Sequence, residues 1–530
     1  MAQNRDPRNV QAWIIGSGIA SLAAAVNLIK KAKVPGHQVH ILDAHDGSGG
    51  AIQVAGDAEK GYILHTGAQP YFLEPCVEDL LAVVPSVNDP NKTVLETIKK
   101  RETHDRPVEK ATTRAIRLSQ GGMSKVDMHR TQIGPKLRMD LIAFIFDNER
   151  PLESKKIRDV FPDSFFQSEF WALWSTMFLL NPWHCAAEFR RLLVKYLSDL
   201  HTHVETHKLE RTRFSLYESL IVPITKYLKD QGVDFRFHAM VTDLRSYPDS
   251  DPTTISEIVT LDNGKEELIT VDPVDIVIVT LGSMSTGMQV GSNQQPPSQS
   301  SPPVEESQRG PGALWEKLAR QSSKFGNPSN FFTRTDESKI ETFTITLRNS
   351  KFMDHYIRLT KDQPGTLLNA VGSPWCLSVN VPNQPVFAEQ PQNVDVIWGY
   401  GLRPEAKGKY VMKPMEQCSG AEILFELFSH LGLATDELLS SAITVPCLMP
   451  RGTSMLLTRS HHDRPNVIPH MTTNIALIGQ YVEIPDDTTL SVEYSVRGAR
   501  MAVTSLMGGL QESIPKVRKN VLWDAFELMV

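Results

Sequence analysis

The sequence predicts an α/β protein that begins with a Rossmann-like parallel sheet. Residues 12–15 are apolar and predict a short buried strand, residues 16–18 (Gly-Ser-Gly) a tight turn, and residues 19–29 an alanine-rich helix. A second predicted strand, over residues 38–43, ends in Asp43. A glycine turn between strand and helix, followed by a strand that ends in an acid, is typical of a dinucleotide-binding βαβ unit.

Each position of this unit has a predicted role. Gly16 permits the tight turn, and Gly18 lets a pyrophosphate approach the backbone at the positive end of the helix dipole. Ser21 stands where a third glycine is usual and is small enough for close packing of helix on strand. The carboxylate of Asp43 is suited to a ribose hydroxyl, which favours a ribose without a phosphate.

A glycine cluster follows the second predicted strand directly. Residues 46–51 read Asp-Gly-Ser-Gly-Gly-Ala, and Gly49 and Gly50 lie where flavoproteins bring backbone along the cofactor. This position favours FAD over NAD.

A second unit near the other end of the chain supports the same cofactor. Residues 473–481 predict a strand that closes on Gly479 and Gln480, and residues 489–507 predict a helix. Taken alone, this segment is equally an ordinary βα unit. With the glycine cluster it resembles the unit that closes the flavin end of two-domain flavoproteins, so we predict a Rossmann-like two-dinucleotide-binding flavoprotein fold with a mixed substrate domain and helical insertions. Only one glycine fingerprint is present, so no NAD(P)H site is predicted.

The middle of the chain changes character twice. Residues 136–230 have a helical pattern, whereas residues 233–285 predict strands, the last of which leads to Gly282 and Ser283. We interpret this change as the return of the chain to its cofactor domain, with the backbone near Val241 against the adenine.

Residues 341–402 are rich in predicted strands and indicate the sheet of a substrate domain. The predicted division of the chain is residues 1–135, first part of the FAD-binding domain; 136–230, helical substrate-domain segment; 231–290, second part of the FAD-binding domain; 291–312, Pro/Ser/Gln-rich loop; 313–465, substrate domain; and 466–530, C-terminal FAD-closing strand and helix with a tail.

Aromatic and methionine residues cluster at positions 170–183. Such residues either line a cavity for an apolar substrate or form ordinary core, and the pattern alone leaves both interpretations open.

The composition excludes several classes of function. The chain has 530 residues, 41% of them hydrophobic, and a net charge of −6, which gives no support to a nucleic-acid partner. No apolar run is long enough for a membrane span, and a short polar leader runs straight into the first strand. The five cysteines lie far apart without metal-ligand spacing, which predicts reduced thiols, a cytoplasmic location and no metal site.

Several longer motifs resemble the FAD-dependent oleate hydratases, also called the myosin-cross-reactive antigen family. They lie at residues 181–189, 217–223, 282–284, 325–328, 413–415, 479–485 and 492–499. The resemblance implies an enzyme, a hydro-lyase that adds water across an isolated double bond of a long-chain unsaturated fatty acid, with FAD in a structural and electrostatic role. It also implies a homodimer and peripheral contact with membranes.

The chain departs from the family pattern in the loop that carries the chemistry, so it resembles a divergent member with an altered active-site loop. The family has an Arg-Gly-Gly-Arg-Glu run whose glutamate activates water, whereas residues 65–69 here are His-Thr-Gly-Ala-Gln. Gln69 has nearly the shape of glutamate but cannot act as a general base. By the same resemblance Gly67 is a cofactor-binding candidate and Thr453 matches a threonine near the substrate head.

The family's Tyr-Asn-Gln-Tyr-Glu-Ser run is Phe-Ser-Leu-Tyr-Glu-Ser at residues 214–219, so Tyr217 is kept and the first tyrosine is lost. The resemblance implies that a tyrosine hydroxyl protonates the alkene, and the sequence leaves open which of the two it is.

These departures leave several functions open. A diverged hydratase would recruit another base, such as His65 or Glu74. Alternatively, the scaffold carries out double-bond isomerisation or cyclisation of a polyene, which requires protonation and deprotonation but no activated water. A flavin oxidoreductase and a non-catalytic lipid-binding protein are further alternatives.

Overall fold

The structure is a computed structural model of the full chain. It describes residues 4–67, 73–104, 115–119, 122–125, 134–196, 212–248, 251–262, 264–297, 310–349, 351–361, 364–433, 436–508 and 513–517. Most of the predicted Pro/Ser/Gln-rich loop lies outside these ranges. Among the residues so described, no helix combines the length and the apolarity needed to cross a membrane.

A five-stranded parallel sheet forms the first layer of the molecule, with strand order β18-β11-β1-β2-β7. Its strands are β1 (Ala12–Ile15), β2 (Val39–Leu42), β7 (Asp234–Arg236), β11 (Ile276–Thr280) and β18 (Ile475–Ile478). Strands β1 and β18 are buried along their whole length and β11 along all but its last residue, as expected when helices cover both faces of a parallel sheet. This sheet joins segments from the start, the middle and the end of the chain, as the sequence predicts.

Helices α1 (Ile19–Lys30) and α18 (Val492–Met507) pack against each other beside this sheet. Helix α10 (Val222–Asp230) contacts α1, and α2 (Pro75–Leu81) packs on α18 and is followed by α3 (Val94–His104). Both N-terminal elements, β1 and α1, begin where the sequence predicts them.

A three-stranded antiparallel sheet adjoins the parallel one. It consists of β8 (Ala239–Tyr247), β9 (Thr254–Asp262) and β10 (Lys265–Thr270), and α12 (Pro311–Gln321) packs on β8. The short helices α13 (Ser329–Phe332) and α14 (Thr335–Ser338) lead from it into the second half of the molecule.

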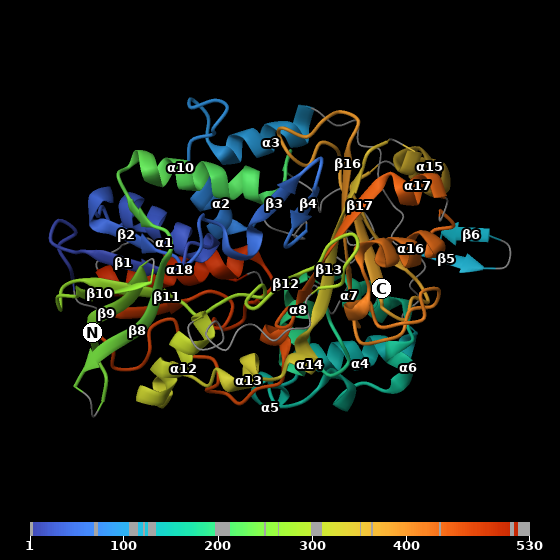
Figure 1. Ribbon diagram of the computed structural model, residues 1–530. Helices are drawn as coiled ribbons and strands as arrows, with labels where there is room; N and C mark the ends of the chain where they lie inside the picture. The colour runs from blue at the N-terminus through green and yellow to red at the C-terminus, as the bar shows by residue number, and fades with distance from the viewer. Residues whose placement is uncertain are drawn as a thin grey trace.

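An eight-stranded mixed sheet forms the other half of the molecule, on the right of Figure 1. In spatial order its strands are β12 (Gln289–Val290), β17 (Ala442–Met449), β13 (Ile340–Leu347), β16 (Asp395–Gly401), β15 (Leu377–Val381), β14 (Thr366–Ala370), β5 (Ala115–Ser119) and β6 (Gly122–Lys125). Only the β14–β5 pair is parallel. Strands β5 and β6 fall within residues 1–135, which the sequence analysis assigned to the FAD-binding domain, yet they pair with the mixed sheet.

The mixed sheet is covered differently on its two faces. Helices α15 (Lys351–Thr360), α16 (Gly420–His430) and α17 (Asp436–Ser440) pack on one face around a second hydrophobic cluster. On the other face lies β4 (Gly61–Leu64), which pairs with β3 (Val54–Asp57). The backbone N–H groups of Tyr62 and Leu64 donate to the hydroxyls of Thr346 and Thr344, both at 2.9 Å. Strand β4 therefore carries the chain from the glycine cluster onto the mixed sheet.

The helical segment comprises α4 (Pro135–Phe146), α5 (Glu149–Leu152), α6 (Asp163–Phe166), α7 (Glu169–Met177), α8 (Ala186–Tyr196) and a π-helical turn (Tyr217–Ile221) that leads into α10. Helices α4 to α8 close the lower right of the molecule in Figure 1, whereas the π-helical turn of the same segment lies with α10 on the parallel-sheet side. Trp171 and Trp174 of α7 pack edge-to-face on Phe189 of α8. This part of the predicted aromatic cluster is therefore core.

Candidate active site

The glycine turn lies at the carboxyl ends of β1, β11 and β18. Gly16 has a φ of +95°, and a Cβ built on it would lie 3.3 Å from Thr280 Cβ at the end of β11. The Ser21 hydroxyl is 2.9 Å from the Thr280 hydroxyl and so ties α1 to β11. The predicted close packing of helix on strand at Ser21 is therefore present in the structure.

Gly18 faces an open space at the N-terminus of α1. It is the N-cap residue of the helix, and a Cβ built there would meet no atom within 4 Å. The first turn of α1 contains no acidic side chain. Behind the turn the glycine cluster packs closely, because a Cβ on Gly50 would lie 3.3 Å from Gly18 Cα and Gly49 N–H donates to the Ser17 carbonyl at 2.9 Å. An open, positively polarised helix end of this kind fits the pyrophosphate of a dinucleotide.

Asp43 directly follows β2 and is held by protein donors. One carboxylate oxygen accepts hydrogen bonds from the N–H and hydroxyl of Ser17 at 2.7 and 2.6 Å, and the other accepts from the N–H of His45 at 2.8 Å. Although burial opposes ionisation, the hydrogen bond to the His45 ring at 2.8 Å, together with those from Ser17 and the His45 N–H, holds the pKa of Asp43 below its usual value. The carboxylate thus stabilises the glycine turn, and its predicted contact with a ribose stays a prediction.

The loop after β11 contacts the loop after β18, and the two together carry the second group of candidate cofactor-binding residues. Gly282 and Gly479 both have positive φ, +110° and +99°, at these two strand ends. The side chain of Gln480 accepts from Met284 N–H at 3.1 Å and donates to the Thr489 carbonyl at 3.4 Å. The hydroxyl of the neighbouring Ser283 is 2.9 Å from that of Ser285.

Val241 is buried on β8, in the antiparallel sheet that adjoins β2. Its predicted contact with adenine stays a prediction.

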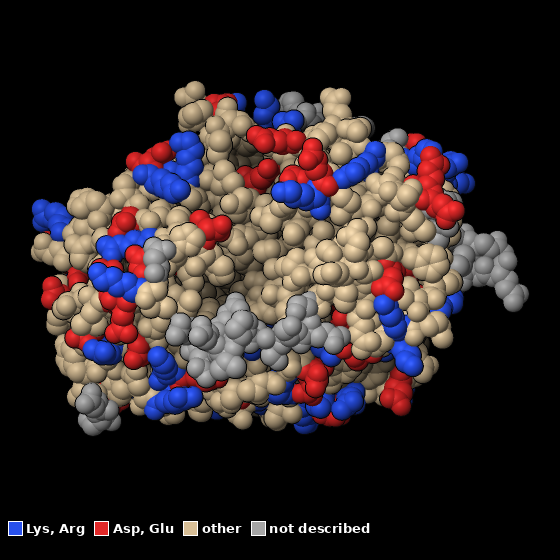
Figure 2. Space-filling model, viewed as in Figure 1, with Lys and Arg blue, Asp and Glu red and all other residues tan. Residues whose placement is uncertain are grey.

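A pocket opens between these strand ends and the mixed sheet. It encloses about 1010 Å³ without protein atoms, including the part open to solvent. Figure 2 shows the molecule hollowed in this middle region, with mostly uncharged residues around the hollow. The lining residues are Thr66, Gly67, Met177, Phe178, Leu179, Tyr196, Met284, Ile340, Thr342, Gly365, Leu367, Asn380, Trp398, Tyr400, Gln480, Leu490 and Ser491.

The end of α7 provides much of the apolar wall. The helix ends at Met177, and Phe178 and Leu179 continue into the pocket, Leu179 with a φ of +53°. A left-handed conformation at a branched residue costs free energy and is found mostly where the surrounding structure fixes it. The aromatic and methionine cluster of the sequence therefore divides: Trp171 and Trp174 lie in the core, whereas Met177, Phe178 and Leu179 line the pocket.

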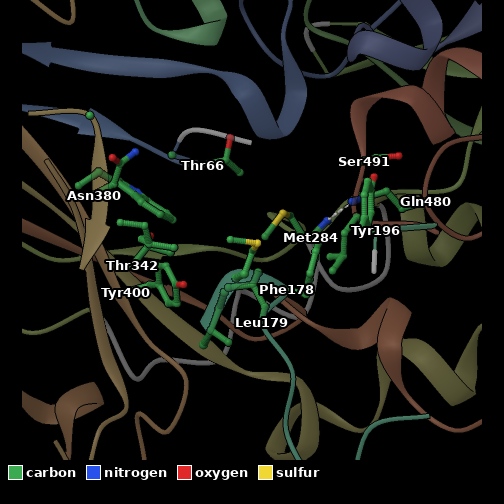
Figure 3. A pocket seen from close by; sticks show the side chains of 17 residues that line it. Thr66, Phe178, Leu179, Tyr196, Met284, Thr342, Asn380, Tyr400, Gln480 and Ser491 are labelled. Carbon is green, nitrogen blue, oxygen red and sulfur yellow. Dashed lines mark hydrogen bonds between the residues drawn. The ribbon is translucent and has the colours of Figure 1, made fainter. Parts of the chain in front are cut away.

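The opposite wall consists of side chains from the mixed sheet, among them Thr342, Asn380 and Tyr400 (Figure 3). Trp398 donates through its indole N–H to the Leu64 carbonyl at 3.1 Å, and Tyr400 donates to the Thr176 carbonyl. A Cβ on Gly67 would lie 2.2 Å from the Trp398 ring. Gly67 thus allows the loop after β4 to lie flat against this tryptophan, a role that the sequence analysis did not predict.

The predicted catalytic candidates occupy different places. Gln69 lies outside the described residues. His65 is half-buried beside the pocket-lining Thr66, and burial together with the nearby His45 lowers its pKa to about 4, so it is neutral at neutral pH. Thr453 is fully buried, and its hydroxyl donates to the Ser338 carbonyl at 3.0 Å rather than lining the pocket.

The ring of Tyr217 packs against the glycine cluster of residues 46–51. The ring comes within 3.1 Å of the position of a Cβ built on Gly49, and Tyr217 begins the π-helical turn before α10. Burial raises the pKa of the Tyr217 phenol, and Asp46 and Glu218 add to the rise. The hydroxyl is therefore protonated at neutral pH, as a proton donor must be.

Sequence reasoning missed the polar group at the other end of the pocket. Tyr196 lines the pocket beside Ser491 and Gln480, as Figure 3 shows, and its hydroxyl donates to Glu74 at 3.0 Å. The sequence suggests Glu74 only because it lies near Gln69. Tyr196 belongs to an amphipathic helix whose sequence pattern indicates packing and does not indicate a pocket.

Comparison with known proteins decides the family. The profile of the MCRA family matches residues 9–504, which is nearly the whole chain. The chain belongs to the MCRA family. An oleate hydratase of Streptococcus pyogenes is 31% identical over 545 residues, which cover 100% of this chain and 90% of that protein. A linoleate hydratase of Lactiplantibacillus plantarum is 28% identical over 551 residues, which cover 96% of this chain and 95% of that protein.

Solved structures agree with the fold of this MCRA protein. A Pyrococcus furiosus protein superposes with a TM-score of 0.52 at 12% identity, over 94% of this chain and 99% of that one. An oxidoreductase from Methanosarcina mazei superposes with a TM-score of 0.50 at 11% identity, over 93% and 99%. Such low identities establish the α/β fold and nothing about activity. The family resemblance and the fold class predicted from the sequence are thus confirmed.

Proposed function

We propose that the protein is an FAD-binding enzyme that acts on a C=C bond of a long-chain unsaturated fatty acid or polyene without net oxidation or reduction. The observation that carries the proposal is the apolar pocket between the loops after β11 and β18 and the mixed sheet, in a chain whose MCRA relatives are named as hydratases of oleate and linoleate. A pocket lined mainly by apolar and aromatic side chains suits a hydrocarbon chain.

The residues present fit FAD. The open face of Gly18 and the N-terminus of α1 would hold the pyrophosphate, and the junction of Gly282, Gly479 and Gln480 would border the flavin end. When bound, the flavin supplies a polar surface that stabilises positive charge developing on the substrate.

The chain's own residues supply proton transfer. Tyr217, protonated at neutral pH, is the proposed donor of a proton to the double bond, which leaves a cationic carbon. Water then adds to this carbon, or a neighbouring carbon loses a proton and the double bond moves. Both outcomes require a base, and Gln69 cannot be that base.

The substitution Gln69→Glu tests which of these outcomes the chain carries out. If the site is a silenced hydratase, the variant forms or increases a hydroxylated product from oleate, measured by mass spectrometry. Glu78→Gln, on the partly exposed side of α2 where Glu78 pairs with Lys99, controls for a change of charge outside the proposed site. No change in hydroxylated product with Gln69→Glu would count against a water-activating role for this position.

Isomerisation or cyclisation is the second candidate, favoured by the absence of a carboxylate at position 69. Its product has the mass of the substrate but a different retention time. A homodimer, peripheral membrane contact and a cytoplasmic location stay predictions of the sequence and the resemblance.

A further inference from the structure

A tyrosine and a carboxyl group meet at one end of the pocket. Tyr196 is the last described residue of α8, and its ring lines the pocket and stacks on Phe178 with the centroids 5.4 Å apart. Its hydroxyl donates to Glu74 Oε1 at 3.0 Å. Glu74, the N-cap residue of α2, also contacts the ammonium group of Lys195 at 2.8 Å through its other oxygen.

Glu74 belongs to a buried chain of ionic contacts with more acids than bases. Lys195 also contacts Asp487 at 2.6 Å, and Arg497 contacts both Asp487 at 2.9 Å and Glu493 at 2.7 Å. Among the described residues joined by these contacts, two cations, Lys195 and Arg497, face three carboxyl groups. Full ionisation would leave one buried negative charge without a cation of its own, which is costly away from water.

A proton on one of the three carboxyl groups would remove this uncompensated charge, and Glu74 is the group that holds it most easily. Asp487 lies between two cations, Lys195 and Arg497, which stabilise its charged form. Glu493 accepts hydrogen bonds from two backbone N–H groups in the first turn of α2, those of Cys76 at 2.9 Å and Val77 at 3.0 Å. Burial raises the pKa of Glu74 to about 7, with Lys195 opposing the rise and Glu493 and Asp487 adding to it. Glu74 can therefore take up and release a proton near neutral pH.

We propose that Tyr196 and Glu74 form the proton-accepting pair of this pocket, in the role that Gln69 cannot fill. This inference rests on the proposed function. Tyr196 is the group in contact with the substrate space, and Glu74 acts through the tyrosine hydroxyl as a positioning and proton-storing residue.

The proposed step transfers one proton and no net electrons. Tyr196 Oη accepts a proton from the cationic substrate while its own hydroxyl proton passes to Glu74. If the proton leaves a carbon next to the cationic centre, the electron pair of the broken C–H bond becomes the new π bond. If it leaves an added water molecule, the pair of the broken O–H bond stays on oxygen. The proton that the donor gave to the alkene is thereby balanced, and no oxidant or reductant is needed.

The pair has a definite pH signature. A base must be deprotonated to act, so kcat rises with pH and levels off above the pKa of Glu74, near 7. The charged and titratable groups that face Glu74 are Lys195 and Tyr196 from α8, Glu493 from α18, and Asp487 from the connection before α18.

The test compares conservative variants of the flavin-loaded enzyme with matched controls. Tyr196→Phe removes only a hydroxyl, and Glu74→Gln keeps the shape of the side chain but cannot accept a proton. The controls are Tyr247→Phe, at the exposed last residue of β8, and Glu78→Gln, one turn along α2 from Glu74. Flavin content, KM, kcat and the pH profile are measured with whichever unsaturated fatty acid the parent enzyme converts.

We expect both variants to retain flavin and KM but to lose roughly 10²-fold or more in kcat. Glu74→Gln should also lose the rise of kcat near pH 7, whereas both controls keep it. Parental kcat and an unchanged pH profile in both variants would overturn the pair while leaving the proposed function intact. Loss of flavin in the variants would make the pair a cofactor contact and equally overturn its role as a base. Absence of product from the parent enzyme would overturn the proposed function itself, and the pair with it.

Discussion

Gly18 is the residue at which cofactor binding can be tested without disturbing the fold. Its φ of −72° is open to any residue, and a Cβ there would meet no protein atom within 4 Å. Gly18→Val should therefore fold normally but lose bound FAD, because the valine side chain fills the space of the pyrophosphate. The flavin-to-protein ratio after purification measures this.

Gly134→Val is a matched control, since Gly134 is also a helix N-cap residue with negative φ and no neighbour within 4 Å of a built Cβ. A parental flavin ratio in Gly18→Val would show that the glycine turn does not bind the cofactor.

The phenol of Tyr217 offers a second test at the scale of a single residue. If its hydroxyl gives the proton to the double bond, Tyr217→Phe should lower kcat by ~10²-fold or more, measured as product formed at saturating substrate. Because Tyr217 packs on Gly49, the flavin content of the variant is measured alongside. Turnover near the parental rate would remove Tyr217 from the mechanism.

Local residues were predictable and distant pairs were not. The turn at Gly16 and the small residue at Ser21 follow from a motif within one βα unit. The contact between Tyr196 and Glu74 joins residues 122 positions apart, and no local pattern records it. The position of Thr453 was not predictable either. Its match to a family threonine does not indicate that its hydroxyl donates a hydrogen bond to the Ser338 carbonyl.

At the scale of elements, α8 is held to the C-terminal half by a buried carboxylate. Glu188 is fully buried, and it contacts Arg459 and Arg464 at 2.9 Å each. Removing one partner of such a group leaves buried charge uncompensated. Glu188→Gln should therefore lower the free energy of unfolding by about 3–5 kcal/mol, measured by denaturant titration.

The exposed Glu266 on β10 provides a control for that measurement, because Glu266→Gln removes a similar charge from the surface. A loss below about 1 kcal/mol in Glu188→Gln, as expected of an exposed ion pair, would contradict the view that Glu188 holds the two arginines.

Strands and helices with strong periodicity were predictable as elements, but their pairing was not. The strand at residues 12–15 and the helix that follows it match β1 and α1 closely. By contrast, β5 and β6 are short and separated by more than 200 residues from the strand β14 with which β5 pairs. Sequence order placed them with the cofactor domain, whereas hydrogen bonding places them in the mixed sheet.

For the whole molecule, the buried ionic cluster that contains Glu188, Arg459 and Arg464 predicts that acid lowers the free energy of unfolding. Glu483 is buried, but Arg191, Arg464 and Arg459 outweigh the burial and lower its pKa to about 2. Since this folded-state pKa is below the ordinary value of 4.5, the stabilisation is complete above pH 4.5 and is lost as pH falls toward 2. Denaturant unfolding at a series of pH values should show the free energy of unfolding falling over this window. A Glu483→Gln variant with the same dependence on pH as the parent would exclude Glu483 as a source.

The central claim is redox-neutral chemistry on a carbon–carbon double bond, and one measurement tests it most directly. The flavin-loaded protein is incubated with a panel of unsaturated fatty acids and polyenes, with the flavin oxidised or reduced, and the products are separated and weighed by liquid chromatography and mass spectrometry. The account predicts a product either heavier than the substrate by one water or equal to it in mass with a changed retention time. A product lighter by two hydrogens, formed as the flavin is reduced, would contradict the account, as would the absence of any product.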